Sequence, residues 1–257
     1  MSGATAGGSA AGDGAALVRD EVRAAVADCA RRMVTDGLAI GTAGNVSARD
    51  GDKIVITPSG RRFDTLQPEE LCVIDLAGQP VDLPLPPSSE VPMHLAAYRQ
   101  TAAGAIVHTH SMFATAVATS CPELPAIHYT IGFLGGPVRV VPYATFGTRE
   151  LADGLRAALA DRHVALLQNH GAVAVGRDVE QAYERARLLE WLAELYYRSS
   201  RLGAPRLLSP AELDAFDAQV AALSYGASER PPETRDSRRD QEPPGNDAPA
   251  GVEIPRG

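Results

Sequence analysis

Lysine is almost absent from this chain of 257 residues, in which Lys53 is the only one. It follows Asp50-Gly51-Asp52, a sequence typical of a hairpin turn. A Schiff-base enzyme needs a lysine amine held in a desolvated pocket. The sequence therefore argues against imine chemistry. Any carbonyl chemistry would need another electrophile, for which a metal ion is the natural substitute.

Cysteine is also scarce, since Cys29, Cys72 and Cys121 lie far apart and no Cys-x-x-Cys motif occurs. An odd, scattered set predicts reduced thiols and a cytoplasmic protein. No segment reaches the apolar length that spans a bilayer, and the first residues lack the basic start and apolar run of a signal peptide. The net charge of −8 gives no reason to expect a nucleic-acid partner.

The two ends of the chain differ in composition from its middle. Residues 1–16 are rich in Gly, Ala and Ser, and residues 227–257 are dominated by Pro, Arg, Asp and Glu. Both tails are expected to be disordered, because they bury too little apolar surface to order themselves. The hydrophobic content of 45% suffices for a core, so residues 17–226 are predicted to form one folded domain.

Residue periodicity predicts the order of helices and strands in this domain. Helical spacing of apolar residues and capping signals predict helices at 17–36, 89–100, 111–120, 148–160, 178–200 and from 210 onward. Short β-rich runs predict strands at 45–49, 53–57, 71–75, 79–82, 104–110, 138–142, 164–168 and 172–175. Hairpin-linked strands mixed with helices indicate an α/β fold with a largely antiparallel central sheet.

Three histidines form the strongest chemical signal in the sequence. His108 and His110 end the strand predicted at 104–110, and both project to the same face because strand side chains alternate. His170 follows a separate predicted strand, in the segment Asn169-His170-Gly171. Three imidazoles with an open fourth position are typical of a catalytic zinc site rather than a closed structural one.

The same histidines have less specific interpretations. A single histidine is more often a hydrogen-bonded residue than a ligand, and period-2 spacing arises easily by chance. A cupin-type oxygenase also contains His-x-His, but it needs a glutamate a few residues later, where this chain has Ala114 and Thr115. The zinc hypothesis therefore depends on other residues.

Three short polar segments have the composition of a phosphate site. They offer small hydroxyls or exposed backbone N–H groups, which bind a phosphate dianion without basic side chains when a helix N-terminus is near. Each segment taken alone also fits ordinary turn chemistry. The segments are Gly41-Thr42-Ala43-Gly44-Asn45, Thr57-Pro58-Ser59-Gly60 and Ser88-Ser89-Glu90.

Seven motifs occur in the order found in one protein family. They are Gly41-Thr-Ala-Gly-Asn-Val-Ser, Ile56-Thr-Pro-Ser-Gly, Ser88-Ser-Glu, Val107-His-Thr-His, Ile127-His-Tyr, Pro142-Tyr-Ala-Thr-Phe-Gly-Thr and Gln168-Asn-His-Gly. In these motifs the chain resembles the class II aldolase/adducin family over about residues 18–226. The resemblance implies an α/β/α sandwich around an antiparallel sheet, assembled as a homotetramer with its sites between subunits.

The resemblance also assigns roles to individual residues. It implies that His108, His110 and His170 bind one zinc ion per subunit. Glu90 corresponds to the catalytic carboxylate, which can also contact the metal. Tyr129 corresponds to a tyrosine that is offered across the subunit interface as a proton donor.

Further residues are implied around the substrate, a phosphorylated sugar. Phe146 corresponds to an apolar pocket wall, and Tyr225 to a tail residue that folds over the site. The residues implied around the substrate phosphate are Thr42, Gly44, Asn45, Ser59, Gly60, Ser88 and Ser89.

The implied activity is reversible cleavage of a ketose 1-phosphate of the L-fuculose 1-phosphate type. The products are dihydroxyacetone phosphate and a hydroxyaldehyde such as L-lactaldehyde, formed through a metal-stabilised enediolate. Glu90 would shuttle a carbon-bound proton, and burial is expected to raise its pKa toward neutrality. The preferred aldehyde stays open, as does the choice among zinc, manganese and cobalt.

Other members of the family have other functions. Enzymes like L-ribulose-5-phosphate 4-epimerase share the loops and histidines but carry Asp after the Ser-Ser pair, where this chain has Glu90. A dehydratase fits the motifs less well, and adducin-like assembly modules need no intact metal set. We predict that His94, one helical turn after Glu90, is a structural partner, and assign no function to His128 or His163.

Overall fold

The structure is a computed structural model that describes residues 18–223. Two units are distinguished along the chain, Met1–Asp217 and Ala218–Gly257, and the second is described only over residues 218–223. Those residues include the end of helix α6 (Pro210–Ala222). The predicted tails at 1–16 and 227–257 lie outside the described residues, and so does Tyr225.

The first unit is built on a sheet of nine strands. Their order is β4-β3-β2-β1-β5-β9-β8-β7-β6, and every neighbouring pair is antiparallel except β7 and β8. The largely antiparallel central sheet is therefore confirmed. The strands are β1 (Asn45–Asp50), β2 (Lys53–Ile56), β3 (Cys72–Asp75), β4 (Pro80–Asp82), β5 (Ala105–Thr109), β6 (Glu123–Leu124), β7 (Val138–Val141), β8 (Val164–Leu167) and β9 (Gly171–Gly176).

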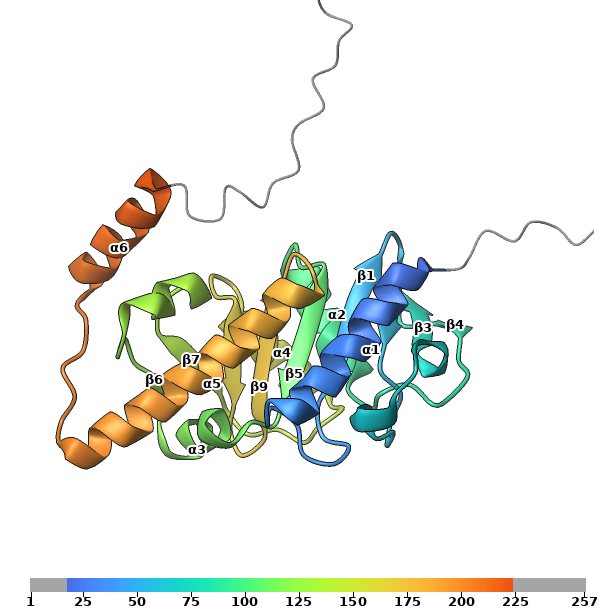
Figure 1. The fold of residues 1–257 in the computed structure, drawn as a ribbon, viewed down its shortest axis with the longest axis horizontal. Coiled ribbons are helices and arrows are strands. Elements are labelled where there is room, and N and C mark those ends of the chain that lie inside the picture. The colour runs from blue at the N-terminus through green and yellow to red at the C-terminus, as the bar shows by residue number, and fades with distance from the viewer. Residues whose placement is uncertain (1–17, 224–257) are drawn as a thin grey trace, which may run out of the picture. The chain divides into compact units, whose positions relative to one another are not determined.

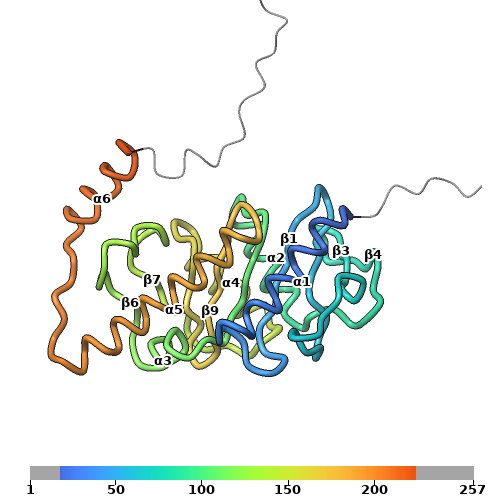
Figure 2. Tube along the Cα trace, viewed as in Figure 1, coloured from blue at the N-terminus to red at the C-terminus, as the bar shows by residue number. Residues whose placement is uncertain are grey.

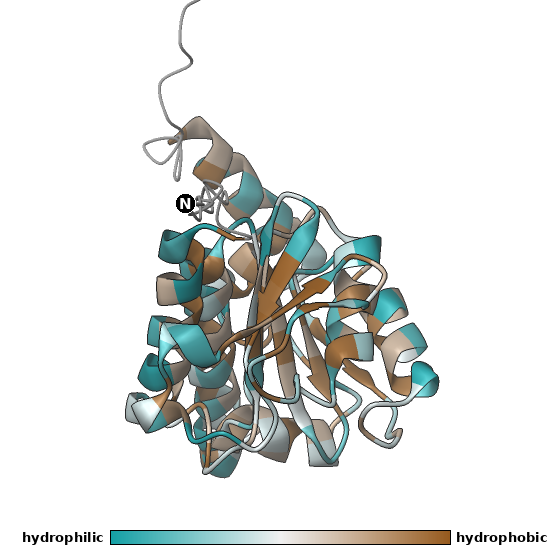
Figure 3. Cartoon of the chain, turned by 90° about the vertical axis from the view of Figure 1, so that its right-hand side faces the viewer, coloured by the Kyte–Doolittle hydropathy of each residue, from teal (hydrophilic) through white to brown (hydrophobic). Residues whose placement is uncertain are grey.

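Helices cover both faces of the sheet (Figure 1). Helices α1, α3 and α5 pack on one face, while α2 and α4 pack together on the other. Seen from the side, the apolar strands lie between the two helical layers (Figure 3). The predicted α/β/α sandwich is confirmed. The helices are α1 (Asp20–Thr35), α2 (Val91–Gln100), α3 (Met112–Ser120), α4 (Arg149–Ala158) and α5 (Val179–Leu202).

Two hydrophobic cores follow from the alternation of strand side chains. Along β5, Val107 belongs to the core beneath α1, α3 and α5, whereas Ile106 belongs to the core beneath α2 and α4. In Figure 2, α1 and α5 run over the same face although they come from opposite ends of the domain, and their residues are in contact. The central strands are thus buried on both sides, which explains their continuous apolar sequence.

Every predicted helix and strand is present, with ends that differ by a few residues. The structure adds the two-residue strand β6 and three 3-10 helices, which are too short to give a periodic signal. The 3-10 helices are η1 (Phe63–Thr65), η2 (Pro68–Glu70) and η3 (Tyr129–Leu134). The three cysteines are free thiols, as predicted. Within residues 18–223, no helix is both long and apolar enough to cross a bilayer.

Helix α3 begins just after the histidine-bearing strand and is capped by a distant side chain. The carboxylate of Glu190, in α5, accepts hydrogen bonds from the backbone N–H groups of Phe113 and Ala114, each at 2.8 Å. Ser111 occupies the N-cap position but makes no such bond with its side chain. Because a helix N-terminus has unpaired N–H groups and a partial positive charge, a carboxylate there stabilises the helix.

We expect Glu190→Ala to lower the free energy of unfolding by about 1–3 kcal/mol, because two charge-assisted hydrogen bonds are lost. Urea unfolding of the metal-free protein, followed by circular dichroism, measures the change. The matched control is Glu194→Ala, one turn further along α5, where the carboxylate pairs with Arg198 at the surface. This control is expected to lose less than about 1 kcal/mol. Equal losses in the two variants would contradict the capping role.

Candidate active site

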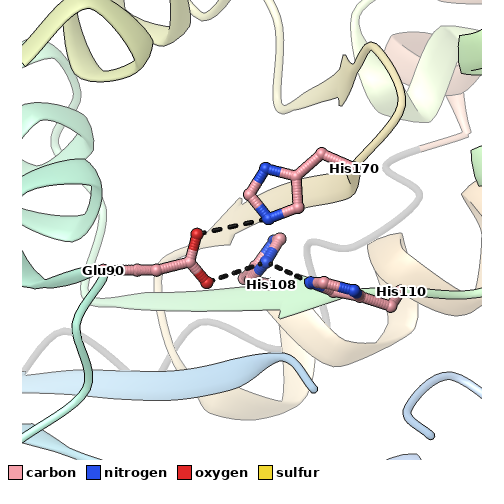
Figure 4. A group of neighbouring side chains, drawn as sticks. All are labelled: Glu90, His108, His110 and His170. Carbon is pink, nitrogen blue, oxygen red and sulfur yellow. Dashed lines mark hydrogen bonds and ion pairs between the residues drawn. The ribbon is translucent and has the colours of Figure 1, made fainter. Parts of the chain in front are cut away.

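The three predicted histidines and Glu90 meet at one point of the structure. The three imidazole ring centroids lie 4.8, 4.9 and 5.0 Å apart. His108 Nε2 lies 2.9 Å from His110 Nε2 and 3.1 Å from Glu90 Oε2, while Glu90 Oε1 lies 3.3 Å from His170 Nε2. Figure 4 shows the four side chains directed toward a common centre. The residues that the sequence singles out for metal binding are therefore brought together.

The sheet register places these side chains. Strands β5 and β9 are neighbours, and Thr109 pairs with Ala172, so the turn before β9 lies beside the end of β5. That turn holds His170. Gly171 follows it, and a Cβ atom there would lie only 2.1 Å from the Thr109 carbonyl oxygen. A glycine is therefore required for the two strand ends to approach closely enough for His170 to reach His108.

The donor set fits a divalent metal ion. His108 Nδ1 donates to the Ala172 carbonyl oxygen at 2.9 Å, which directs its Nε2 at the centre. Candidate ligand atoms of the four residues lie within 4.8 Å of one another. Tetrahedral zinc with bonds of about 2.0–2.1 Å separates its ligands by about 3.3 Å, close to the observed spacings. Glu90 Oε1 is buried without a hydrogen-bond partner, as expected for an atom that faces a cation.

The protonation of the site suits a metal ligand set. Burial, followed by the positive fields of His108 and His170, lowers the pKa of His110 to about 3. The imidazole is therefore neutral, the form that binds metals. Three imidazoles together with one carboxylate form a nitrogen-rich set that suits zinc, although such sites also accept other divalent ions.

The expected rise in the Glu90 pKa is wrong. Burial does raise this pKa, but the charge of His108 and the polar groups that face the carboxylate, among them the Asn45 amide, outweigh burial and hold the pKa below its ordinary range. Glu90 is therefore an ionised carboxylate in the resting site. This state suits a group that removes a proton or contacts a cation.

Glu90, His110 and His170 border a cavity of about 290 Å³, and the buried His108 lies behind them. All seven residues predicted around the phosphate line it, together with Phe146, Glu90, His110 and His170. No Lys or Arg residue is among its lining residues in the described part of the chain. The polar loops and the candidate metal ligands are thus two walls of one pocket. The predicted phosphate loops are Thr42, Gly44 and Asn45, Ser59 and Gly60, and Ser88 and Ser89.

Gly44 joins the first polar loop to the metal-ligating strand. Its φ is +91°, a conformation that residues with a side chain rarely adopt, and a Cβ atom would lie 2.7 Å from the His108 carbonyl oxygen. Asn45 follows at the start of β1 and pairs in register with His108. Its amide nitrogen donates to Glu90 Oε2 at 2.8 Å, so Asn45 contacts the carboxylate as well as lining the cavity.

Two polar residues that the sequence analysis did not single out for this role also line the cavity. Tyr143 follows β7 and is exposed, and Asn169 precedes His170. Asn169 has a φ of +53°, the only positive φ at a non-glycine residue that the described part of the chain contains. Its position in the Gln168-Asn-His-Gly motif was a usable signal, because Asn tolerates the left-handed conformation.

Tyr129 does not line this cavity. It lies in η3, where it is 52% exposed and stacks on His128 and Phe216 at centroid distances of 4.4 and 5.3 Å. His94, predicted to be a structural partner, contacts Ser47 and Asn45, as expected.

Comparison with known proteins agrees with this geometry. The sequence profile described as the Class II Aldolase and Adducin N-terminal domain matches residues 24–197. The 5-deoxy-D-ribulose 1-phosphate aldolase of Bacillus thuringiensis serovar kurstaki is 38% identical over 187 residues, which are 72% of this chain and 88% of that protein.

Two further proteins are similar. The 5-methylthioribulose-1-phosphate/5-deoxyribulose-1-phosphate aldolase of Rhodospirillum rubrum is 40% identical over 199 residues, 76% of this chain and 89% of that protein. A solved structure of an L-fuculose 1-phosphate aldolase superposes with a TM-score of 0.78 at 33% identity, and covers 81% of this chain and 100% of that one. The chain therefore belongs to the class II aldolase and adducin family.

Proposed function

We propose that this chain is a divalent-metal-dependent aldolase that reversibly cleaves a ketose 1-phosphate to dihydroxyacetone phosphate and an aldehyde. One observation carries the proposal: Glu90 and the three histidines converge at the edge of a cavity that the phosphate-type loops also line. The aldolase names of similar proteins support the same reaction class.

When bound, a divalent ion such as zinc would supply Lewis-acid stabilisation of the negative charge that develops on substrate oxygens. Glu90 handles the carbon-bound proton. In the direction of synthesis, its carboxylate removes a proton from C3 of dihydroxyacetone phosphate, C3 attacks the aldehyde carbon, and the aldehyde oxygen takes up a proton. Cleavage is the reverse. The Asn45 amide, 2.8 Å from Glu90 Oε2, holds the carboxylate in place.

Imine chemistry lacks a nucleophile in this chain. Lys53 is the only lysine, and its Nζ lies 3.1 Å from Asp52 Oδ1 at the turn between β1 and β2. It is not among the residues that line the cavity. The proposed enzyme therefore activates its substrate through the metal site alone.

The phosphate end of the substrate is assigned to the polar loops. Ser88 and Ser89 line the cavity and directly precede Glu90 and helix α2. Their hydroxyls and the N–H groups of a helix N-terminus are both groups that bind anions. Thr42, Ser59 and Gly60 complete that wall. Neutral donors would thus bind the dianion without a basic side chain.

The other end of the substrate faces aromatic side chains. Phe146 and Tyr143 line the cavity and are 63% and 59% exposed, so they offer apolar surface to the carbon chain. This suits a sugar that ends in a methyl or methylthio group. We place L-fuculose 1-phosphate first among the candidates, with 5-deoxyribulose 1-phosphate and 5-methylthioribulose 1-phosphate as alternatives suggested by similar proteins.

We further propose a homotetramer with sites between subunits. Elements η3 and α5 carry four exposed large aromatic side chains, Tyr129, Phe133, Trp191 and Tyr197. Exposed large aromatic residues are enriched in protein interfaces. Tyr129 of the partner subunit would then give the aldehyde oxygen its proton. Tyr225, the proposed tail residue over the site, lies outside the described residues.

A panel assay tests the proposed function. Protein with a verified metal content is incubated with the three ketose 1-phosphates and with L-ribulose 5-phosphate, and dihydroxyacetone phosphate is followed by its enzymatic reduction with NADH. We expect release of dihydroxyacetone phosphate from at least one ketose 1-phosphate. Interconversion of pentulose 5-phosphates without that product would favour the epimerase. A metal-free protein that stays inactive after zinc addition would favour an adducin-like assembly module.

A further inference from the structure

We propose that His94 is a positioning residue for Glu90 and acts through Asn45, in a directed chain of buried hydrogen bonds that begins at Tyr98. The role in catalysis rests on the proposed function, because that function gives Glu90 the proton transfer. The chain of hydrogen bonds itself rests only on the geometry of residues on α2 and β1.

Five residues form this chain of hydrogen bonds, and the periodicities of helix α2 and strand β1 bring them together. Glu90, His94 and Tyr98 are spaced by four residues at the start of and along α2, so they share one face of that helix. Asn45 and Ser47 are two residues apart on β1 and share one face of the strand. Where these faces meet, all five residues are buried, and His94 is completely inaccessible to solvent.

Chemistry fixes the direction of each hydrogen bond. The Glu90 carboxylate only accepts, so the Asn45 atom that faces its Oε2 at 2.8 Å is the NH₂ group. The Asn45 carbonyl oxygen therefore faces His94 Nε2, which must carry a proton to donate to it.

The remaining links follow from that proton. His94 is buried without a carboxylate partner of its own, which favours the neutral imidazole. Its Nδ1 is then an acceptor, and the Ser47 hydroxyl, 2.7 Å away, donates to it. Ser47 Oγ in turn accepts from the Tyr98 hydroxyl at 2.8 Å. Protons therefore point from Tyr98 through Ser47, His94 and Asn45 to Glu90.

This direction makes the two Glu90 oxygens unequal. Oε2 is held by Asn45, whereas Oε1 is buried without a hydrogen bond and is the oxygen left for the metal ion or the substrate. If the Asn45 amide turned over, its carbonyl oxygen would face the carboxylate and its NH₂ group would face the His94 N–H. Both contacts are repulsive in a dry interior. His94 thereby prevents the amide flip that would release Glu90.

The tautomer of His94 tests the chain without any turnover. The protein has six histidines, so two-dimensional spectra of protein labelled with ¹⁵N at histidine are tractable, and His94→Gln assigns the His94 signals. We expect a neutral ring with its proton on Nε2. A proton on Nδ1, or a charged ring, would overturn the proposal even if the proposed aldolase activity were confirmed. The spectrum is equally decisive if that activity fails.

Kinetics test the positioning role. In His94→Leu we expect kcat for the active ketose 1-phosphate to fall about 10- to 100-fold, because misplacing a catalytic group by about 1 Å can cost about 100-fold in rate. KM and zinc content should be unchanged. His94→Gln, which can both donate and accept, should restore kcat to within about threefold of wild type. Met93→Leu, a buried neighbour outside the chain of hydrogen bonds, controls for packing on α2.

A double-mutant cycle separates positioning from folding. If His94 acts through Asn45, His94→Leu should lower kcat no further in an Asn45→Ala background. An equal loss in both backgrounds, or equal losses for Leu and Gln at position 94, would overturn the proposal. Should His94→Leu not fold, Ser47→Ala replaces it in the cycle with the same two outcomes, since it removes only the hydroxyl that fixes the tautomer.

Discussion

Glu90→Gln is expected to keep about one zinc ion per chain while turnover of the ketose 1-phosphate falls about 10²- to 10⁴-fold. The glutamine amide has the shape of the carboxylate and leaves the three imidazoles in place, so the metal stays bound. It has no basic oxygen that can take a proton from C3. The resting Glu90 is an ionised carboxylate, and this is the form that the substitution removes.

Two measurements separate the loss of the base from the loss of the metal. Elemental analysis gives the zinc content, and NMR in D₂O gives the exchange of the C3 proton of dihydroxyacetone phosphate without any aldehyde. Glu90→Gln should lose this exchange along with turnover. Glu150→Gln, on the exposed first turn of α4, is the matched control and should behave as wild type. C3 exchange at the wild-type rate in Glu90→Gln would contradict the assignment of Glu90 as the base.

The fold was largely predictable because its elements are long or strongly patterned. Helix α5 repeats apolar residues over 24 positions, and β5 and β9 are uninterrupted apolar runs that fit a sheet covered on both faces. The strand order could not be predicted from residue periodicity, because it depends on contacts between distant segments. The pairing of β1 with β5, which sets Asn45 opposite His108, is such a contact.

The metal site could be predicted from the sequence only in part. His108 and His110 share a strand face, a local property that spacing reveals, whereas the approach of His170 depends on the register of β5 and β9. The phosphate loops were identified by composition and by family resemblance, and they do line one cavity. Their contact with a phosphate stays a prediction.

The electrostatics of the site could not be predicted from residue types. Burial of Glu90 suggested a raised pKa, but the charge of His108, followed by the polar groups that face the carboxylate, lowers the pKa instead. The cap of α3 could not be predicted either, since nothing in the sequence near Phe113 indicates that Glu190 accepts a hydrogen bond from its N–H group. The spacing of Glu90, His94 and Tyr98 was a usable signal for the buried chain of hydrogen bonds, because four-residue spacing marks one helix face.

His110→Ala is expected to lose bound zinc and to lower turnover by about 10³-fold or more. Lewis-acid stabilisation of the developing charge is worth several kcal/mol, and each 1.36 kcal/mol is a factor of about ten in rate. The remaining ligands, His108, His170 and Glu90, would leave one side of the ion open. Chelation of the wild-type protein should have the same effect, and added zinc should reverse it.

The control and the binding measurement make the test independent of turnover. A ligand that binds only the folded state raises the melting temperature, so zinc should stabilise the wild type but not His110→Ala. His163→Ala is the matched control, because His163 lies outside the metal-binding group and should keep both zinc and activity. Full turnover after exhaustive chelation would show that the reaction does not need the metal. Without a metal or a usable lysine, no electrophile would remain in this cavity to stabilise the charge that forms when the carbon–carbon bond breaks.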